Sequence, residues 1–459
     1  MIPVPAQPLP LFLAGRSPAA PQPSARFVTR AHPSGRYLLD QYGEPLLIRG
    51  SSYWGAVQQI TTTADIRALY SHIGAYGGNA AIVDVVGSVG VGGNDNGQTS
   101  DGVAPFVGGD ITQFNPTYWA RVDQHVVAAR DNGVTLWLIA MDWYATGVAG
   151  TTFNGKSSGD CQSYGANLSA RYPQTAYPNI VWMLGNDYDD PPGSANTVFS
   201  ACLTGIRSTG DTRMMTIMLG EPEPTASTDT ATWEAVATIN CVYTYPNGYD
   251  KTLACYRRTP GVRDPRPAIG TESRYEGDTW FTISGEPNPN TEAIRRQELW
   301  WLTSGSCGAF YGNNDWRFPA GWQGRLTSWT AENQLRTVRD WWTSLPWTTL
   351  VPDDQSAIVT AGRGTYSSAT SGHSWDNDYV TACYNAAGTC AAVYIPTNSG
   401  VTSRTVTIDP AKMQAGFRAY WVDPTNALNR FPATPSGNTY TDPGTHTDGY
   451  RDWILWLTI

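Results

Sequence analysis

Several acidic residues stand at or just after short apolar runs that are predicted to form strands. The sequence places Asp84, Asp142, Asp187, Glu221, Glu272, Glu276 and Asp315 in such positions. A carboxyl group beside a buried strand costs free energy unless it is paired or used. Two carboxyl groups at one reacting centre can divide the work, because one donates a proton while the other attacks or activates water. These residues are therefore the first candidates for chemistry.

Asp187 and Glu272 are the strongest of these candidates. Asp187 follows the apolar run NIVWML and the pair Gly-Asn, and Glu272 follows PAIGT. Arg274 stands close enough along the chain to hold the Glu272 carboxyl ionised. Each acid also has a structural alternative, because Asp187 suits a helix N-cap and Glu272 suits a simple ion pair with Arg274. Position along the chain leaves both alternatives open.

The elements that must position these acids follow a repeating strand–helix order. Apolar strands are predicted at 46–49, 79–86, 134–141, 179–184, 214–219, 239–243, 268–270 and 308–311. Between the second and third strands, Tyr118, Val122, Val126 and Ala129 recur at helical spacing, and Asn-Gly at 132–133 ends the helix. Eight strands joined by helices predict a (β/α)₈ TIM barrel, an α/β fold whose catalytic residues stand at the carboxyl ends of the strands.

Composition changes twice along the chain, which predicts three segments. Residues 1–35 are rich in Pro, Ala and Ser and are expected to form an N-terminal tail. Residues 36–352 hold the barrel. In residues 353–459, short β-rich runs alternate with Gly, Pro, Asn and Asp, which predicts a C-terminal antiparallel β-sandwich as an accessory domain.

Charge and composition argue against several classes of function. The net charge is −9 and the chain has no run of Lys or Arg, so a nucleic acid is not expected as a partner. No stretch approaches the roughly 18 to 20 apolar residues of a membrane span. Only 5 His residues are present and none form an HxxxH pair, so neither a catalytic metal nor another cofactor is expected. The 19 Trp and 24 Tyr residues suit stacking on sugar rings.

Four stretches resemble the apiosidase-like glycoside hydrolases, which often carry a collagen-binding-type C-terminal domain. In chain order they are GRYLLDQYGEPLLIRGSSYW, RYPQTAYPNIVWMLGNDYDD, PAIGTESRYEG and SGSCGAFYGNNDWRF. The tail segments FRAYWVDPTNA and DWILWL are also similar to the β-sandwich of that family. The resemblance runs from about residue 36 to the end, in the order of the family.

This resemblance implies roles for the two acids. Asp187 corresponds to the acid/base and Glu272 to the nucleophile of a retaining mechanism. Glu276 is the second candidate for the nucleophile, because the Glu-x-x-Tyr-Glu motif contains two glutamates. Retention requires the two carboxyl groups to stand about 5 to 5.5 Å apart. Burial beside Trp182 or another aromatic residue would raise the pKa of Asp187, so that it arrives protonated.

Polar and aromatic side chains near the strand ends are expected to bind the substrate. Sugar hydroxyl groups need Asp and Asn partners, and sugar faces need Trp and Tyr. The candidates are Trp54, Asp142, Trp143, Asn186, Tyr245, Arg274, Glu276, Tyr311, Asn313, Asn314 and Trp316. For each aromatic residue, packing between helix and strand is the alternative. Ser51 and Ser52 follow Gly50 where the family usually has Asp, so one sugar contact is expected to differ.

The 7 cysteines offer uncertain evidence about the compartment. Cys383 and Cys390 flank a predicted hairpin turn and should lie on adjacent strands, whether bridged or not. The pairs Cys241/Cys255 and Cys161/Cys202 are weaker candidates for disulfides. Bridged cysteines would indicate an oxidising compartment, whereas free buried thiols are the alternative. The first residues of the chain do not form a clear signal peptide.

Together these features predict an extracellular or secreted retaining glycoside hydrolase that acts on an oligo- or polysaccharide. Pentose- or furanose-containing glycans of plant or bacterial cell walls are implied by the resemblance alone. The alternative is a non-catalytic carbohydrate-binding or adhesion protein of a surface or virion appendage. Such a protein would need the aromatic and amide groups but not both carboxylates. Neither the sugar nor the oligomeric state follows from the sequence.

Overall fold

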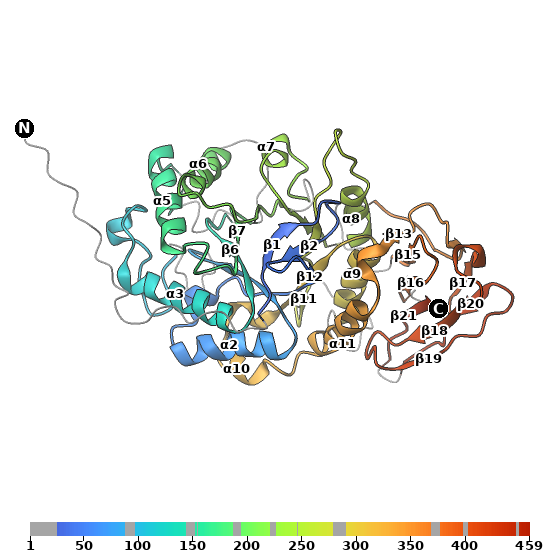
Figure 1. Cartoon of the computed structure of the whole chain (residues 1–459). Coiled ribbons are helices and arrows are strands. Elements are labelled where there is room, and N and C mark those ends of the chain that lie inside the picture. Colours follow the sequence, from blue (N-terminus) through green and yellow to red (C-terminus); the bar gives the residue numbers. More distant parts are fainter. Residues whose placement is uncertain are drawn as a thin grey trace, which may run out of the picture.

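The computed structural model describes residues 25–87, 97–143, 152–153, 155–186, 194–220, 226–245, 247–278, 291–368, 377–397, 403–446 and 449–459. Figure 1 shows two parts in these residues: a barrel of strands surrounded by helices, and a C-terminal β-domain beside it. Asp187 and Glu221 lie outside the described residues, so the predicted Asp187–Glu272 separation stays a prediction.

Eight parallel strands form the barrel, in the order β8-β7-β6-β5-β4-β12-β10-β9, and the short strand β11 (Tyr275–Glu276) pairs with β12 off this path. They are β4 (Ile48–Ser52), β5 (Ala80–Asp84), β6 (Thr135–Ile139), β7 (Ile180–Met183), β8 (Met215–Thr216), β9 (Asn240–Tyr243), β10 (Ala268–Glu272) and β12 (Gly308–Asn313). The strands β8 and β9 are the two ends of this order, so the barrel is nearly closed. The predicted (β/α)₈ barrel is confirmed.

Helices surround the barrel between its strands (Figure 1). They are α1 (Ala56–Gln59), α2 (Thr63–Ala75), α3 (Pro116–Asp131), α5 (Ser158–Arg171), α6 (Ser194–Ser208), α7 (Ala231–Glu234), α8 (Gly248–Tyr256), α9 (Thr291–Thr303), α10 (Trp322–Arg325) and α11 (Thr330–Ser344). The predicted helix is α3: its four spaced residues are buried, and it ends at Asn132 before Gly133, whose φ is 73°.

Alternate strand residues fill the interior of the barrel. On each strand, residues two apart point to the same face. One buried cluster inside the barrel accordingly contains Ala80 and Ile82 of β5, Trp137 and Ile139 of β6, and Val181 and Met183 of β7. Gly50 makes room for the ring of Phe310, since a Cβ at Gly50 would lie 2.2 Å from a ring carbon of Phe310. The interior is therefore a packed core that supports whatever stands at its carboxyl end.

A short antiparallel sheet adds to the amino-terminal part of the fold. Its strands are β1 (Val28–Ala31), β2 (Leu38–Asp40) and β3 (Pro45–Leu46). Val28, Leu38 and Leu46 are buried in the same cluster as the barrel interior. Residues 25–35, which the sequence assigned to the tail, therefore belong to the fold, because their apolar side chains pack against the barrel.

The C-terminal domain consists of two antiparallel sheets. One contains β13 (Leu350–Pro352), β15 (Thr381–Asn385), β16 (Cys390–Ile395), β21 (Trp453–Thr458), β18 (Arg418–Val422) and β19 (Arg430–Pro432) in spatial order. The other contains β14 (Val359–Ala361), β17 (Thr405–Ile408) and β20 (Thr439–Thr441). Val393 and Leu455 of the first sheet and Val406 of the second share one buried cluster. The predicted antiparallel sandwich is confirmed.

All seven cysteines are buried and free. Cys383 on β15 and Cys390 on β16 lie on adjacent antiparallel strands, as expected, and both belong to the cluster that faces the barrel helices. Cys161 and Cys202 lie on the neighbouring helices α5 and α6. The structure thus has buried thiols at the positions considered for disulfides, and the cysteines carry no information about an oxidising compartment.

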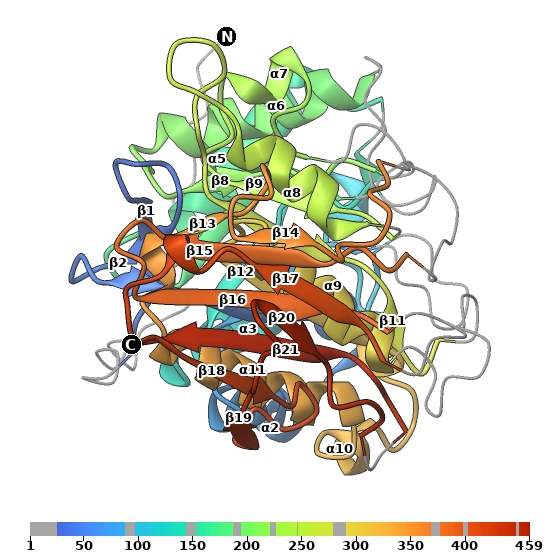
Figure 2. The same ribbon diagram turned by 90° about the vertical axis from the view of Figure 1, so that its right-hand side faces the viewer.

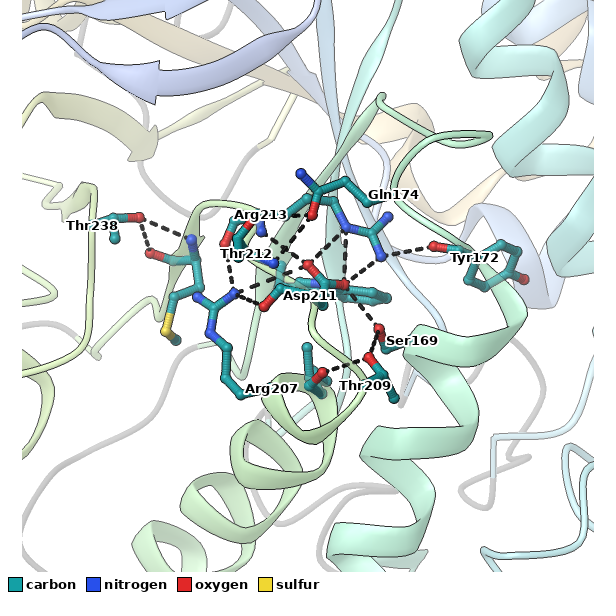
Figure 3. A network of polar contacts seen from close by, with 12 residues as sticks. Ser169, Tyr172, Gln174, Arg207, Thr209, Asp211, Thr212, Arg213 and Thr238 are labelled. Atoms are coloured by element: carbon teal, nitrogen blue, oxygen red, sulfur yellow. Dashed lines mark hydrogen bonds and ion pairs between the residues drawn. The ribbon is translucent and has the colours of Figure 1, made fainter.

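A polar network fixes the start of β8 to α5 and α6 (Figure 3). Burial alone would raise the pKa of Asp211, but hydrogen bonds from Arg213 hold it below its usual range. The indole N–H of Trp182 also donates to Asp211, at 2.9 Å, and Trp182 belongs to the cluster outside the barrel. Trp182 therefore takes part in this network. Because Asp187 lies outside the described residues, the expected burial of Asp187 beside Trp182 or another aromatic residue stays a prediction.

The six-stranded sheet is packed against α9 and α11, which lie behind its strands in Figure 2. A fully buried ion pair joins the two parts: Arg295 of α9 contacts Asp452 at 2.6 Å, and the Tyr394 hydroxyl donates to Asp452 at 3.2 Å. This pairing makes the sandwich an integral part of the fold rather than a loosely tethered module.

We expect Asp452→Asn to lower the free energy of unfolding by about 3 to 5 kcal/mol, because it leaves the Arg295 charge buried without its counter-ion. Urea unfolding of the full chain measures this loss. The matched control is Asp354→Asn, which removes a more exposed pair with Arg257 at 2.8 Å and should cost less than about 1 kcal/mol. Equal losses of stability in the two variants would show that the buried Arg295–Asp452 pair contributes no more than an exposed pair.

Candidate active site

Three carboxyl groups gather at the carboxyl end of the barrel. Asp84 ends β5, Asp142 follows β6 and Glu272 ends β10. Asp84 and Asp142 are buried, and Glu272 is half-buried. Burial raises the pKa of Asp84 well above its usual range, and the negative charges of Asp142 and Glu272 raise it further. The strand ends thus bring together acids that lie up to nearly 190 residues apart in the sequence, as the barrel requires.

Glu272 is held by a short chain of hydrogen bonds. The indole N–H of Trp54 donates to the Tyr275 hydroxyl at 2.5 Å, and that hydroxyl donates to Oε1 of Glu272 at 3.0 Å. Trp54 and Tyr275 are buried in the cluster that fills the barrel interior. A donated hydrogen bond favours the charged form of a carboxyl group and fixes its orientation. This arrangement suits a carboxylate that must attack a fixed point.

Replacing Tyr275 by Phe should lower kcat on a glycoside substrate by about 10- to 100-fold, because Glu272 loses the donor that orients it. The acid limb of the pH–rate profile should move to higher pH, since the charged carboxylate is less favoured. The matched control is Tyr164→Phe, whose hydroxyl donates to the Ala140 carbonyl at 2.7 Å. A control profile that shifts equally, or a Tyr275→Phe profile that does not shift, would contradict this role.

Glu276, the other glutamate of the motif, is engaged in a structural contact. Its two oxygens accept the backbone N–H of Ala331 at 2.9 and 3.0 Å in the first turn of α11. The Tyr311 hydroxyl donates to Oε2 at 2.6 Å. Burial raises the pKa of Glu276 above its usual value, and these hydrogen bonds offset only part of that shift. Glu276 and Tyr311 therefore hold the start of α11.

Residues 313–315 follow the end of β12 and make structural contacts. Asn313 accepts the backbone N–H of Asp315 at 2.9 Å, and Asp315 is paired with Arg325 at 2.5 Å. The Asn314 amide donates to the Gly277 carbonyl. These contacts hold the turn after β12 together.

Trp316 and Tyr245 are half-buried aromatic residues at the barrel mouth. Both pack against the interior cluster, and the ring centroid of Trp316 lies 6.0 Å from that of Tyr275. The Tyr243 hydroxyl donates to the Tyr245 hydroxyl at 3.0 Å. Their role in binding a sugar stays a prediction.

Trp143 faces the helices instead. Its ring lies 5.4 Å from the ring of Phe199 on α6, at 71°, which is the packing alternative raised from the sequence. Its backbone N–H donates to Oδ1 of the buried Asn186 at 3.1 Å. Asn186 therefore ties the ends of β6 and β7 together, directly before Asp187.

Arg274 is buried two residues after Glu272. Glu272 accepts the Tyr275 hydroxyl, and the expectation that Arg274 also holds this carboxylate stays a prediction. Tyr275 was missed as a site residue, although it is the tyrosine of the Glu-x-x-Tyr-Glu motif. Its position three residues after Glu272 was the available signal.

The described part of the chain contains neither a cluster of metal ligands nor a helix that could span a membrane. No group of three or more His, Cys, Asp or Glu side chains there is arranged to hold a metal ion. No helix there has the length and apolar character to cross a membrane.

The comparisons with known proteins agree with this architecture. Residues 32–349 match the family model described as "Apiosidase-like, catalytic domain". A solved glycoside hydrolase is similar with a TM-score of 0.71 and 19% identity, over 94% of this chain and 97% of that chain. A glycoside hydrolase of family 5 from Bacteroides vulgatus has a TM-score of 0.70 and 20% identity, over 95% and 94%. No curated protein matches the chain.

Proposed function

Because the chain belongs to the apiosidase-like catalytic-domain family, we propose that it is a retaining glycoside hydrolase with Glu272 as nucleophile and Asp187 as acid/base. The observation that carries this proposal is the Glu272 carboxyl group, placed at the end of β10 and held by the Tyr275 hydroxyl at 3.0 Å. A protein that only bound sugars would need no carboxylate oriented in this way.

The proposed reaction has two displacements at the anomeric carbon. Asp187 donates a proton to the glycosidic oxygen while Glu272 attacks the carbon, so the C–O bond to the leaving group breaks and a glycosyl ester forms. Asp187, now ionised, removes a proton from water, which attacks the same carbon and releases Glu272. Trp54 and Tyr275 hold Glu272 in place through both steps.

The proposed substrates are pentose- or furanose-containing glycans of plant or bacterial cell walls, and the proposed location is outside the cell. Membership of the family supports this substrate class. The half-buried rings of Tyr245 and Trp316 support a sugar as ligand, because aromatic faces stack on the C–H faces of sugars. The proposed polar partners for the sugar hydroxyl groups include Asp142, which follows β6, and Asn186, which follows β7.

The experiment is a screen of aryl glycosides and cell-wall polysaccharides for released sugar, followed by proton NMR of the first product. Retention of the anomeric configuration is the expected result. Initial inversion would contradict the double-displacement mechanism, and the two carboxyl groups would then stand about 6.5 to 9.5 Å apart. Binding of a glycan without any hydrolysis would favour the alternative of a carbohydrate-binding protein.

A further inference from the structure

Asp84 ends β5 on the interior side of the barrel. Ala80 and Ile82 of the same strand belong to the interior cluster, so the alternation of side chains directs Asp84 inward as well. The backbone N–H of Asp84 donates to the Trp54 carbonyl at 3.0 Å, which fixes β5 against the end of β4. The Asp84 carboxyl thus lies at the same end of the barrel as Glu272.

The Asp84 carboxyl group differs from other fully buried aspartates of the described structure. Asp40 accepts two backbone N–H groups at 2.9 Å, and Asp452 is paired with Arg295 at 2.6 Å. Both oxygens of Asp84 are buried without a hydrogen-bond partner. An unsatisfied buried carboxyl group lowers stability, so it is expected where a ligand supplies the partner.

The backbone next to Asp84 leaves room for this carboxyl group. A Cβ at Gly87 would lie 2.7 Å from the Cβ of Asp84 and 2.9 Å from its Oδ2. A larger residue at Gly87 would press on the carboxyl group. The glycine at position 87 therefore leaves the space that the Asp84 carboxyl group occupies.

The protonation state of Asp84 suits a hydroxyl ligand. Burial, with the nearby charges of Asp142 and Glu272, raises its pKa well above the usual range, which favours the neutral form. A neutral carboxyl group has one O–H donor and a carbonyl acceptor. A sugar hydroxyl is also both donor and acceptor, so it can satisfy both oxygens of Asp84.

We propose that Asp84 is a specificity-determining residue that binds one hydroxyl group of the sugar ring entering the barrel mouth. This assignment rests on the proposed glycosidase function and names a contact within the same site. A buried group that hydrogen-bonds a substrate hydroxyl discriminates strongly against an analogue without it, because the protein group is then left unpaired. Asp84 thereby selects sugars by the position of that hydroxyl.

The test uses the aryl glycoside that the wild-type enzyme hydrolyses and its monodeoxy analogues, each lacking one hydroxyl group. We expect one analogue to lose at least about 100-fold in kcat/KM with the wild type. Asp84→Leu should lose a similar factor on the parent glycoside and discriminate less than about 10-fold at that one position. Discrimination at the other positions should persist. Asp84→Asn, which keeps a donor and an acceptor, should retain more activity than Asp84→Leu.

Thermal unfolding separates this role from a structural one. Asp84→Leu should melt at the wild-type temperature or up to about 3 °C higher, because an unsatisfied polar group is removed. The matched control Asp40→Leu removes a satisfied carboxyl group and should melt lower. If Asp84→Leu is folded and discriminates among all the analogues as the wild type does, the assignment is wrong. Lower melting temperatures for both Asp84 variants, with unchanged discrimination in Asp84→Leu, would indicate a structural role and would also overturn it.

A failure of the proposed glycosidase function gives a different result from a failure of the Asp84 assignment. If the wild type hydrolyses no glycoside, the glycosidase proposal fails, and saturation-transfer NMR then measures binding of the same parent and deoxy sugars to the wild type and to Asp84→Leu. Loss of binding for one deoxy sugar with the wild type, but not with Asp84→Leu, would still support the contact. Identical binding patterns for the two proteins, or no binding to either, would overturn it.

Discussion

Replacing Glu272 by Gln is expected to lower kcat/KM by at least about 10⁴-fold while the protein stays folded and still binds sugar. The amide has nearly the shape of the carboxylate but cannot attack the anomeric carbon. The Tyr275 hydroxyl, which donates to Oε1 of Glu272 at 3.0 Å, can still donate to the amide oxygen. Initial rates on the best aryl glycoside of the screen, together with a thermal melt, measure the effect.

Glu276→Gln is the matched control, because the two glutamates share one motif. Glu276 accepts the Ala331 N–H and the Tyr311 hydroxyl, so its replacement should lower the free energy of unfolding by about 1 to 3 kcal/mol. Its kcat/KM should stay within about 10-fold of the wild type. If Glu272→Gln keeps near-full activity while folded Glu276→Gln is inactive, the nucleophile has been assigned to the wrong glutamate. Full activity in both would refute the mechanism.

Replacing Asp187 by Asn should produce a loss that depends on the leaving group. General acid catalysis contributes about 10² to 10⁴-fold, and poor leaving groups need the proton most. We therefore expect kcat/KM to fall by about 10³-fold on an alkyl glycoside or an oligosaccharide. On a dinitrophenyl glycoside, whose leaving group needs little protonation, the loss should stay below about 10-fold.

Rates on both substrates test this expectation, and Asp189→Asn is the control because it changes a neighbouring acid in the same segment. The control should affect both substrates equally and slightly. Equal losses on the two substrates with Asp187→Asn would show that Asp187 does not donate the proton. Added azide should accelerate the second step in Asp187→Asn and give a glycosyl azide of retained configuration, since an anionic nucleophile needs no general base.

The architecture was predictable because it depends on regular patterns along the chain. Strands such as β6 and β7 are buried on both faces and appear as short apolar runs, and Asn132-Gly133 marks the end of α3. Such runs, repeated eight times with helices between them, have few other ways to bury their apolar side chains. Tail residues 25–35 were misassigned, because Pro, Ala and Ser composition does not show which apolar side chains pack on a distant sheet.

The site could be predicted only in part. The candidate acidic and aromatic residues all stand near strand ends, and what distinguishes one from another is which side chains they contact. The order of residues along the chain puts Glu272 and Glu276 at the end of one strand, with Tyr275 between them. The contacts that separate them appear only in the folded chain, where Glu276 holds the first turn of α11 and Glu272 accepts the Tyr275 hydroxyl. Likewise, Trp143 and Trp182 have the residue type of sugar-binding side chains but pack outside the barrel. Hydrogen bonding and burial depend on partners from distant segments, and a local sequence pattern does not specify those partners.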